Sequence, residues 1–128
     1  MAMNPELILV DDDKILLIIL KKMIGIVNPD CQLTAFSSAS DALAYISVNP
    51  GRSCWIMLDI NLKEMSAWEF MDELMVKISS PPNIILMTSS VSSSNVEKAK
   101  KYSSVIGFFE KPVTVENVRQ IFELINKD

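Results

Sequence analysis

The chain has 128 residues, of which 49% are hydrophobic and 22% are charged, and its formal net charge is −4 at pH 7. This length suits one domain over residues 1–128 with its own core, and the composition excludes an extensively disordered chain. The acidic balance argues against direct nucleic-acid binding, because affinity for a phosphate backbone depends on Lys and Arg. We find no secretory signal or membrane span, and two cysteines without metal-type spacing suit a reducing, cytoplasmic setting.

Four short apolar runs are each followed directly by polar residues. The runs are Leu7–Val10, Trp55–Leu58, Ile84–Met87 and Val105–Phe109. An unbroken apolar run is typical of a strand that helices cover on both faces, as in parallel sheets. Residues Cys31–Phe36 alternate apolar and polar instead, which is typical of an edge strand. These segments predict a five-stranded sheet whose second strand lies at an edge.

Helical patterns occupy the intervals between the predicted strands. The first helix, Lys14–Val27, is expected to bury one apolar stripe, made of Leu16, Ile19, Leu20, Met23 and Val27. Four further apolar residues fall partly outside this stripe: Ile15, Leu17, Ile18 and Ile26. They indicate either a broad buried face or an exposed patch that docks a partner. Ser38 or Ser40 can cap a second helix that runs to about Val48. Capping boxes at Ser66–Glu69 and Ser94–Glu97 predict the starts of the third and fourth helices, and the fourth is expected to end near Tyr102. The last helix is predicted over Val113–Asn126. Strand–helix alternation predicts an α/β, flavodoxin-like (βα)5 three-layer sandwich with a parallel sheet in the order 2-1-3-4-5.

The polar residues after the strands should meet at one edge of this sheet, because ligands bind at the carboxyl ends of parallel strands. Asp11, Asp12 and Asp59 would repel one another, by about 3 kcal/mol for each close pair at an effective dielectric of about 20, so they require a cation. An open cup of carboxylate oxygens suits Mg²⁺. A carboxylate can then accept a phosphoryl group, while the Thr88 hydroxyl and the Lys111 ammonium contact its oxygens.

Together, Asp11-Asp12, Asp59, Thr88 and Lys111-Pro112 resemble the receiver domain of two-component response regulators, over Leu7–Asn126. The resemblance implies that Asp59 accepts a phosphoryl group from a sensor histidine kinase or a histidine phosphotransfer protein. It also implies a Mg²⁺ site made by Asp11, Asp12, Asp59 and the backbone carbonyl of Asn61, phosphate contacts from Thr88, Ser89 and Lys111, a switch aromatic at Phe108, and a cis Lys111–Pro112 bond. The phosphodonor is expected to dock around Ile15, Leu16, Ile19 and Pro112, and an unknown downstream protein around Val96, Lys100, Phe108 and Val115.

Lys63 and the pair Ser66-Ala67 depart from the family pattern in the loop after Asp59. Lys63 stands where Pro is usual, and Ser66-Ala67 replaces the usual Asp-Gly or Asn-Gly, so this loop is expected to follow a different path. The leading interpretation is a single-domain switch without an output domain, and not an enzyme beyond Mg²⁺-dependent self-phosphorylation and slow self-dephosphorylation. The alternatives are an interaction module that is never phosphorylated and a hydrolase using Asp59, which Asn61 and the absence of His disfavour.

Overall fold

A computed structural model describes residues 5–51, 53–80, 82–89 and 92–126. Its five strands are β1 (Glu6–Val10), β2 (Leu33–Phe36), β3 (Cys54–Asp59), β4 (Asn83–Thr88) and β5 (Val105–Glu110). They form one parallel sheet in the order β2-β1-β3-β4-β5. The helices are α1 (Lys14–Val27), α2 (Ala39–Ser47), α3 (Ala67–Lys77), α4 (Ser93–Ala99) and α5 (Val115–Asn126). This is the predicted flavodoxin-like fold.

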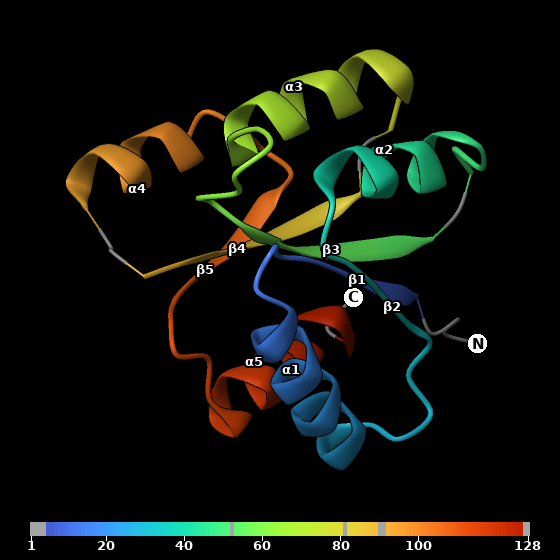
Figure 1. Cartoon of the computed structure of the whole chain (residues 1–128), viewed down its shortest axis with the longest axis vertical. Coiled ribbons are helices and arrows are strands. Elements are labelled where there is room, and N and C mark those ends of the chain that lie inside the picture. Colours follow the sequence, from blue (N-terminus) through green and yellow to red (C-terminus); the bar gives the residue numbers. More distant parts are fainter. Residues whose placement is uncertain (1–4, 52, 81, 90–91, 127–128) are drawn as a thin grey trace.

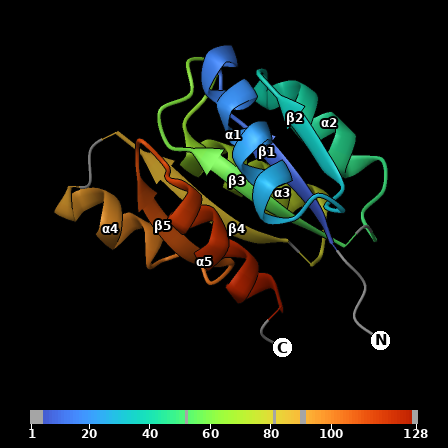
Figure 2. The ribbon, with the colours of Figure 1, turned by 90° about the horizontal axis from the view of Figure 1, so that it is seen from below.

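The helices cover the sheet on both faces, with α2, α3 and α4 on one side and α1 and α5 on the other (Figure 1). The view from below places α1 and α5 in front of the strands (Figure 2). Successive residues of β1 belong to opposite cores: Ile8 and Val10 pack under α2 and α3, whereas Leu7 and Leu9 pack against α1 and α5. Burial on both faces explains why β1 is an unbroken apolar run.

Helix α1 buries a different stripe from the one that periodicity predicted. Leu17, Leu20 and Ile24 are buried, whereas Ile19 is 47% exposed. Of the predicted stripe, Leu20 is buried and only Ile19 is exposed, while Leu16, Met23 and Val27 are half-buried against the same core. The observed stripe is therefore rotated from the predicted one toward Leu17 and Ile24. The exposed side chains Ile15, Ile18, Ile19 and Ile26 lie on the side of the helix away from Leu17, Leu20 and Ile24. Because α1 is apolar on two opposite faces, periodicity alone cannot identify the face that packs, and the docking-patch alternative fits the exposed one.

The predicted helix starts are confirmed at three positions, including Lys14 of α1, and shifted at two. Ser38 caps α2, and Ser66 with Glu69 forms the predicted capping box of α3. The predicted box at Ser94 is wrong, because Ser92 accepts the N–H of Asn95 at 3.2 Å and α4 ends at Ala99, short of Tyr102. Helix α5 begins at Val115 rather than Val113. Ser90 and Val91 of the serine-rich loop lie outside the described residues.

Within the described ranges, none of the helices combines the length and the hydrophobicity needed to cross a bilayer.

Candidate functional site

The three aspartates after β1 divide into two roles. Asp13 is the N-cap of α1, and its Oδ1 accepts the N–H groups of Ile15 and Leu16 at 3.1 and 3.2 Å. Asp11 is fully buried, and its Oδ1 accepts the N–H of Asp13 at 2.9 Å. Asp12 is half-buried. The chain turns into the helix at this point, so one carboxylate satisfies the helix terminus and two remain at the end of the strand.

The strand register brings Asp59 next to this pair. Val10 lies opposite Leu58, so the residues that follow, Asp11 and Asp59, are neighbours at the carboxyl ends of β1 and β3. Asp59 is 4% exposed, and its Oδ1 accepts the N–H of Asn61 at 3.2 Å. One carboxylate oxygen from each of Asp11, Asp12 and Asp59 lies within 4.8 Å of the others. The predicted acidic cluster therefore exists as a geometric unit, here called the acid pocket.

Lys111 enters the acid pocket from the end of β5. Its Nζ lies 2.8 Å from Oδ2 of Asp11 and 3.2 Å from Oδ2 of Asp59. Its N–H donates to the Thr88 carbonyl at 2.7 Å, which fixes the turn after β5 against the end of β4. Burial alone would lower the pKa of Lys111, but hydrogen bonding and attraction from Asp11, then Asp59, raise it above its ordinary value. The ammonium is therefore held protonated between two carboxylates.

The acid pocket nevertheless keeps an excess of negative charge. Three carboxylates face one ammonium, and burial, the largest contribution, raises the pKa of Asp11 above its ordinary value. Each carboxylate accepts one hydrogen bond from a backbone N–H: Asp11 from Asp13, Asp12 from Lys63 and Asp59 from Asn61. The oxygen donors are therefore oriented before any ligand arrives. This oxygen-only donor set fits a hard divalent cation such as Mg²⁺.

The loop after Asp59 contacts the acid pocket through its main chain. The N–H of Lys63 donates to Oδ2 of Asp12 at 2.8 Å, and Ala67 is a buried residue in the first turn of α3. Among the described residues none outside glycine has a positive φ, so this path requires no glycine at Ala67. Sequence reasoning marked Lys63 as a departure but missed its contact with Asp12, because a main-chain donor leaves no trace in side-chain identity.

Glu64 ties the same loop to the start of α2. Its carboxylate accepts the Ser40 N–H at 3.2 Å, the Ser38 hydroxyl at 3.2 Å and the Ser40 hydroxyl. Hydrogen bonds from Ser40, the largest contribution, lower the pKa of Glu64 below its ordinary value. The loop is therefore anchored on one side to the acid pocket and on the other to a neighbouring helix.

The other predicted site residues occupy different depths. Thr88 is fully buried at the end of β4, and Ser89 next to it is exposed. Phe108 is half-buried on β5 opposite Leu86, where it lines a groove of about 430 Å³ with α4. Asn61 contacts Asp59 through its N–H, and the role of its carbonyl stays a prediction. The structure thus brings together Asp11, Asp12, Asp59 and Lys111, with Thr88 bound to the main chain of Lys111.

The predicted docking residues lie beside the acid pocket. Ile15, in the first turn of α1, is 71% exposed, Leu16 is half-buried and Ile19 is 47% exposed. Pro112 is exposed, and the Lys111–Pro112 bond is cis, as predicted. Ile15 lies two residues after Asp13 and Pro112 directly follows Lys111, so both border the carboxyl ends of β1 and β5, whereas Ile19 lies about one turn further along α1.

Comparisons with known proteins agree with this geometry. The family model described as the response regulator receiver domain matches residues 7–123. Among curated protein sequences, no match was found. A two-component response regulator from Cytophaga hutchinsonii is similar in structure, with a TM-score of 0.86, 20% identity and coverage of 99% of this chain and 100% of its own.

Two further solved structures show the same fold. A two-component response regulator from Legionella pneumophila has a TM-score of 0.81 at 18% identity and covers 97% of this chain and 99% of its own. A CheY-like response regulator receiver domain protein from Methanospirillum hungatei has a TM-score of 0.79 at 19% identity, with coverage of 98% and 96%.

Proposed function

Since the chain belongs to the response regulator receiver domain family, we propose that it is a phosphorylation switch whose acceptor is Asp59. The single observation that carries this proposal is the acid pocket, in which Asp11, Asp12 and Asp59 converge within 4.8 Å and Lys111 bridges two of them. A merely structural site would not gather three carboxylates around one ammonium, because each close pair of like charges costs about 3 kcal/mol at an effective dielectric of about 20.

The donor is a phosphohistidine of a sensor histidine kinase or a histidine phosphotransfer protein. A carboxylate oxygen of Asp59 forms a bond to phosphorus as the bond between phosphorus and the imidazole nitrogen breaks, and the imidazole keeps that electron pair. Asp11, Asp12, Asp59 and the carbonyl of Asn61 would hold Mg²⁺. Bound there, the ion supplies positive charge that screens the phosphoryl oxygens from the carboxylates.

Phosphorylation changes the partners of Lys111. As an acyl phosphate, Asp59 no longer carries the carboxylate charge that Lys111 contacts at 3.2 Å. The ammonium keeps its 2.8 Å contact with Asp11 and gains the phosphoryl oxygens as new acceptors. Because the N–H of Lys111 is bound to the Thr88 carbonyl, the ends of β4 and β5 respond together.

Thr88 and Ser89 supply hydroxyl donors for the phosphoryl group at the end of β4, and Phe108 on β5 repacks in response. Phe108 is half-buried in the groove beside α4, so it has room to change its packing. The output then passes to a downstream protein on the surface around Val96, Lys100, Phe108 and Val115. We place this signalling in the cytoplasm.

The acceptor is tested by incubating the protein with Mg²⁺ and acetyl phosphate or phosphoramidate and measuring its intact mass. A single phosphoryl adduct is expected, abolished by EDTA and by Asp59→Asn. Asp13→Asn is the matched control, because Asp13 belongs to the same acidic run but caps α1, and Asn caps helices equally well. No adduct on the wild type would indicate an unphosphorylated interaction module, and continuous phosphate release at enzymatic rates would indicate a hydrolase.

The docking surface is tested with two isoleucines of similar exposure. Ile15 is 71% exposed beside the acid pocket, and Ile26 is 67% exposed about three turns further along α1. Ile15→Asp is expected to slow phosphotransfer from the histidine donor about tenfold, the effect of losing one important interface residue, while leaving modification by acetyl phosphate intact. Ile26→Asp should slow transfer less. Equal losses with both donors, or equal effects of both variants, would contradict docking at Ile15, Leu16, Ile19 and Pro112.

A further inference from the structure

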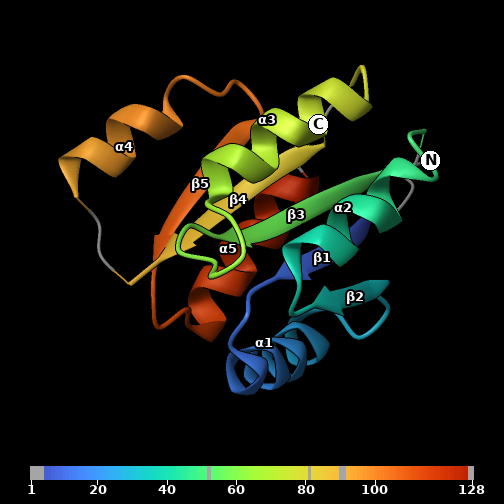
Figure 3. The ribbon, with the colours of Figure 1, turned by 45° about the horizontal axis from the view of Figure 1, so that its top comes forward.

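A small pocket lies between α3 and α4, on the face of the sheet opposite α1 and α5. It has a volume of about 230 Å³ and is lined by Trp68, Lys98, Lys101 and Tyr102. Figure 3 shows α3 lying between α2 and α4 on this face. The rings of Trp68 and Tyr102 stack with centroids 5.8 Å apart and planes tilted by 24°. The pocket therefore joins an aromatic surface from α3 to the basic end of α4.

The aromatic surface is held in place from both sides. The Tyr102 hydroxyl donates to Oδ1 of Asp72 at 3.0 Å, and Lys98 Nζ lies 5.9 Å from the centre of the Trp68 ring. Burial, then Asp72, raises the pKa of Tyr102, so the phenol stays a neutral donor to this carboxylate. The pocket therefore presents the fixed ring faces of Trp68 and Tyr102 together with the ammonium groups of Lys98 and Lys101.

The charge of this region is opposite to that of the chain as a whole. Lys98, Lys100 and Lys101 lie within four residues of a chain whose net charge is −4. Lys100 pairs with Glu97 at 3.3 Å. Across the part of the chain that the structure describes, no carboxylate pairs with Lys98 or Lys101. Two unpaired ammonium groups therefore flank an apolar hollow, which favours an anionic partner.

The size of the pocket limits what can enter it. Small-molecule sites usually measure about 300–1,000 Å³, so a hollow of about 230 Å³ suits one large side chain better than a whole cofactor. We propose that this pocket docks an acidic peptide segment of a partner protein, with one aromatic side chain against Trp68 and Tyr102 and flanking Asp or Glu residues paired with Lys98 and Lys101. The pocket is separate from the acid pocket, because the residues that line it do not include Asp11, Asp12 or Asp59.

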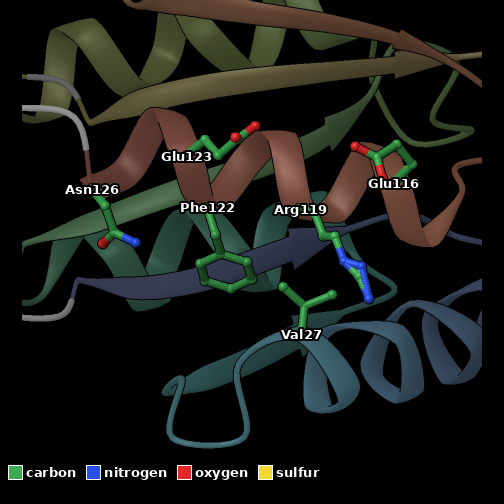
Figure 4. Close-up of a pocket in the computed structure, with 6 residues that line it drawn as sticks. All are labelled: Val27, Glu116, Arg119, Phe122, Glu123 and Asn126. Carbon is green, nitrogen blue, oxygen red and sulfur yellow. The ribbon is translucent and has the colours of Figure 1, made fainter.

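A larger hollow elsewhere does not carry a comparable inference. It measures about 480 Å³ and lies between the end of α1 and α5, where Phe122 and Arg119 of α5 point toward Val27 (Figure 4). Its cation, Arg119, is accompanied by Glu116 and Glu123, so its charges give no preference for an occupant.

The docking proposal is tested with three blocked peptides on the whole, unphosphorylated protein without Mg²⁺, so that its failure leaves the phosphorylation proposal untouched. The peptides are Glu-Asp-Phe-Asp-Glu, the neutral Gln-Asn-Phe-Asn-Gln and the ring-less Glu-Asp-Gly-Asp-Glu. The first should shift the amide NMR signals of Trp68, Lys98, Lys101 and Tyr102 and bind at least tenfold more tightly than the other two. Equal binding of the neutral or the ring-less peptide would overturn the proposal, as would absence of binding or shifts centred elsewhere.

A matched pair of charge reversals locates the site independently. Lys98→Glu with Lys101→Glu should weaken binding of the acidic aromatic peptide at least tenfold. Lys21→Glu with Lys22→Glu changes the net charge equally on exposed positions of α1 and should leave binding within about twofold. Equal weakening by the two double variants would show that binding depends only on net charge, and would overturn the proposal that the peptide binds in this pocket. Circular dichroism of each variant verifies that the fold is kept.

Discussion

A buried carboxylate lies at each end of β1, and the two have opposite surroundings. Glu6, at the amino end, is 7% exposed and accepts hydrogen bonds from the Tyr45 hydroxyl at 2.7 Å and from the Thr34 hydroxyl. Asp11, at the carboxyl end, is fully buried beside two further carboxylates. One carboxylate is surrounded by donors from β2 and α2, and the other is placed among like charges.

The difference separates a carboxylate that neighbouring hydroxyl groups satisfy from one that, in the proposed function, helps to hold a metal ion. A buried carboxylate that hydroxyl groups satisfy contributes to stability, because hydrogen bonds to charged groups are worth about 1.5–3 kcal/mol. A cluster of carboxylates destabilises the folded state, because the charges repel one another and Lys111 offsets only part of that repulsion. The remaining cost is met by the stability of the rest of the fold. The acid pocket therefore keeps an excess of negative charge that a bound divalent cation can balance.

The largest effect on stability is expected at Lys111. Lys111→Gln leaves Asp11 and Asp59 without their ammonium partner and should destabilise the metal-free protein by about 3 kcal/mol, as removal of one partner from a buried ion pair does. Urea denaturation in EDTA measures this loss.

Asp59→Asn in the Lys111→Gln background supplies the internal check. It removes one of the repelling charges, so the double variant should recover part of the lost stability. Strict additivity of the two substitutions would show that Lys111 and Asp59 are not coupled, which would contradict the charge balance described for the acid pocket.

The next effect is expected at the other end of β1. Glu6→Gln replaces the charged acceptor of the Tyr45 and Thr34 hydroxyls and should destabilise the protein by about 2 kcal/mol. Glu73→Gln, an exposed carboxylate on α3, should change stability by less than about 0.5 kcal/mol. If the Glu6→Gln variant were as stable as the wild type or more stable in urea denaturation, Glu6 would not be a stabilising carboxylate, and the contrast with the acid pocket would be contradicted.

The sequence predicts the acid pocket better than it predicts α1. Apolar strands that stop at Asp11, Asp59 and Lys111 determine where those side chains gather, because parallel strands end at one edge of the sheet. In α1, the alternative apolar faces around Leu17 and Ile19 have the same periodicity. Only the position of α1 over the sheet and beside α5 selects the buried face, and that information lies outside the helix.

Main-chain contacts and competing caps account for the remaining differences. The bond from the Lys63 N–H to Asp12 depends on the path of the loop, which side-chain identity does not specify. At α4, Ser94 has the Glu three positions later that a capping box needs, but the observed cap is Ser92, which accepts the Asn95 N–H through its side chain alone.

The smallest effect is expected at Glu64, which resembles Glu6 in its hydroxyl donors but is exposed. Its pKa is lowered from 4.5 in the folded chain, first by hydrogen bonds from Ser40, so the folded state holds the proton less tightly than the unfolded state. The contribution of Glu64 to stability is therefore complete above the unfolded value and is lost as the pH falls through the lower folded value. Glu64→Gln should be slightly less stable than the wild type near neutral pH, and the gap in urea midpoints should close on acidification. A gap that stayed constant with pH would mean that the charge of Glu64 does not hold the loop, leaving the Lys63 contact with Asp12 as its anchor.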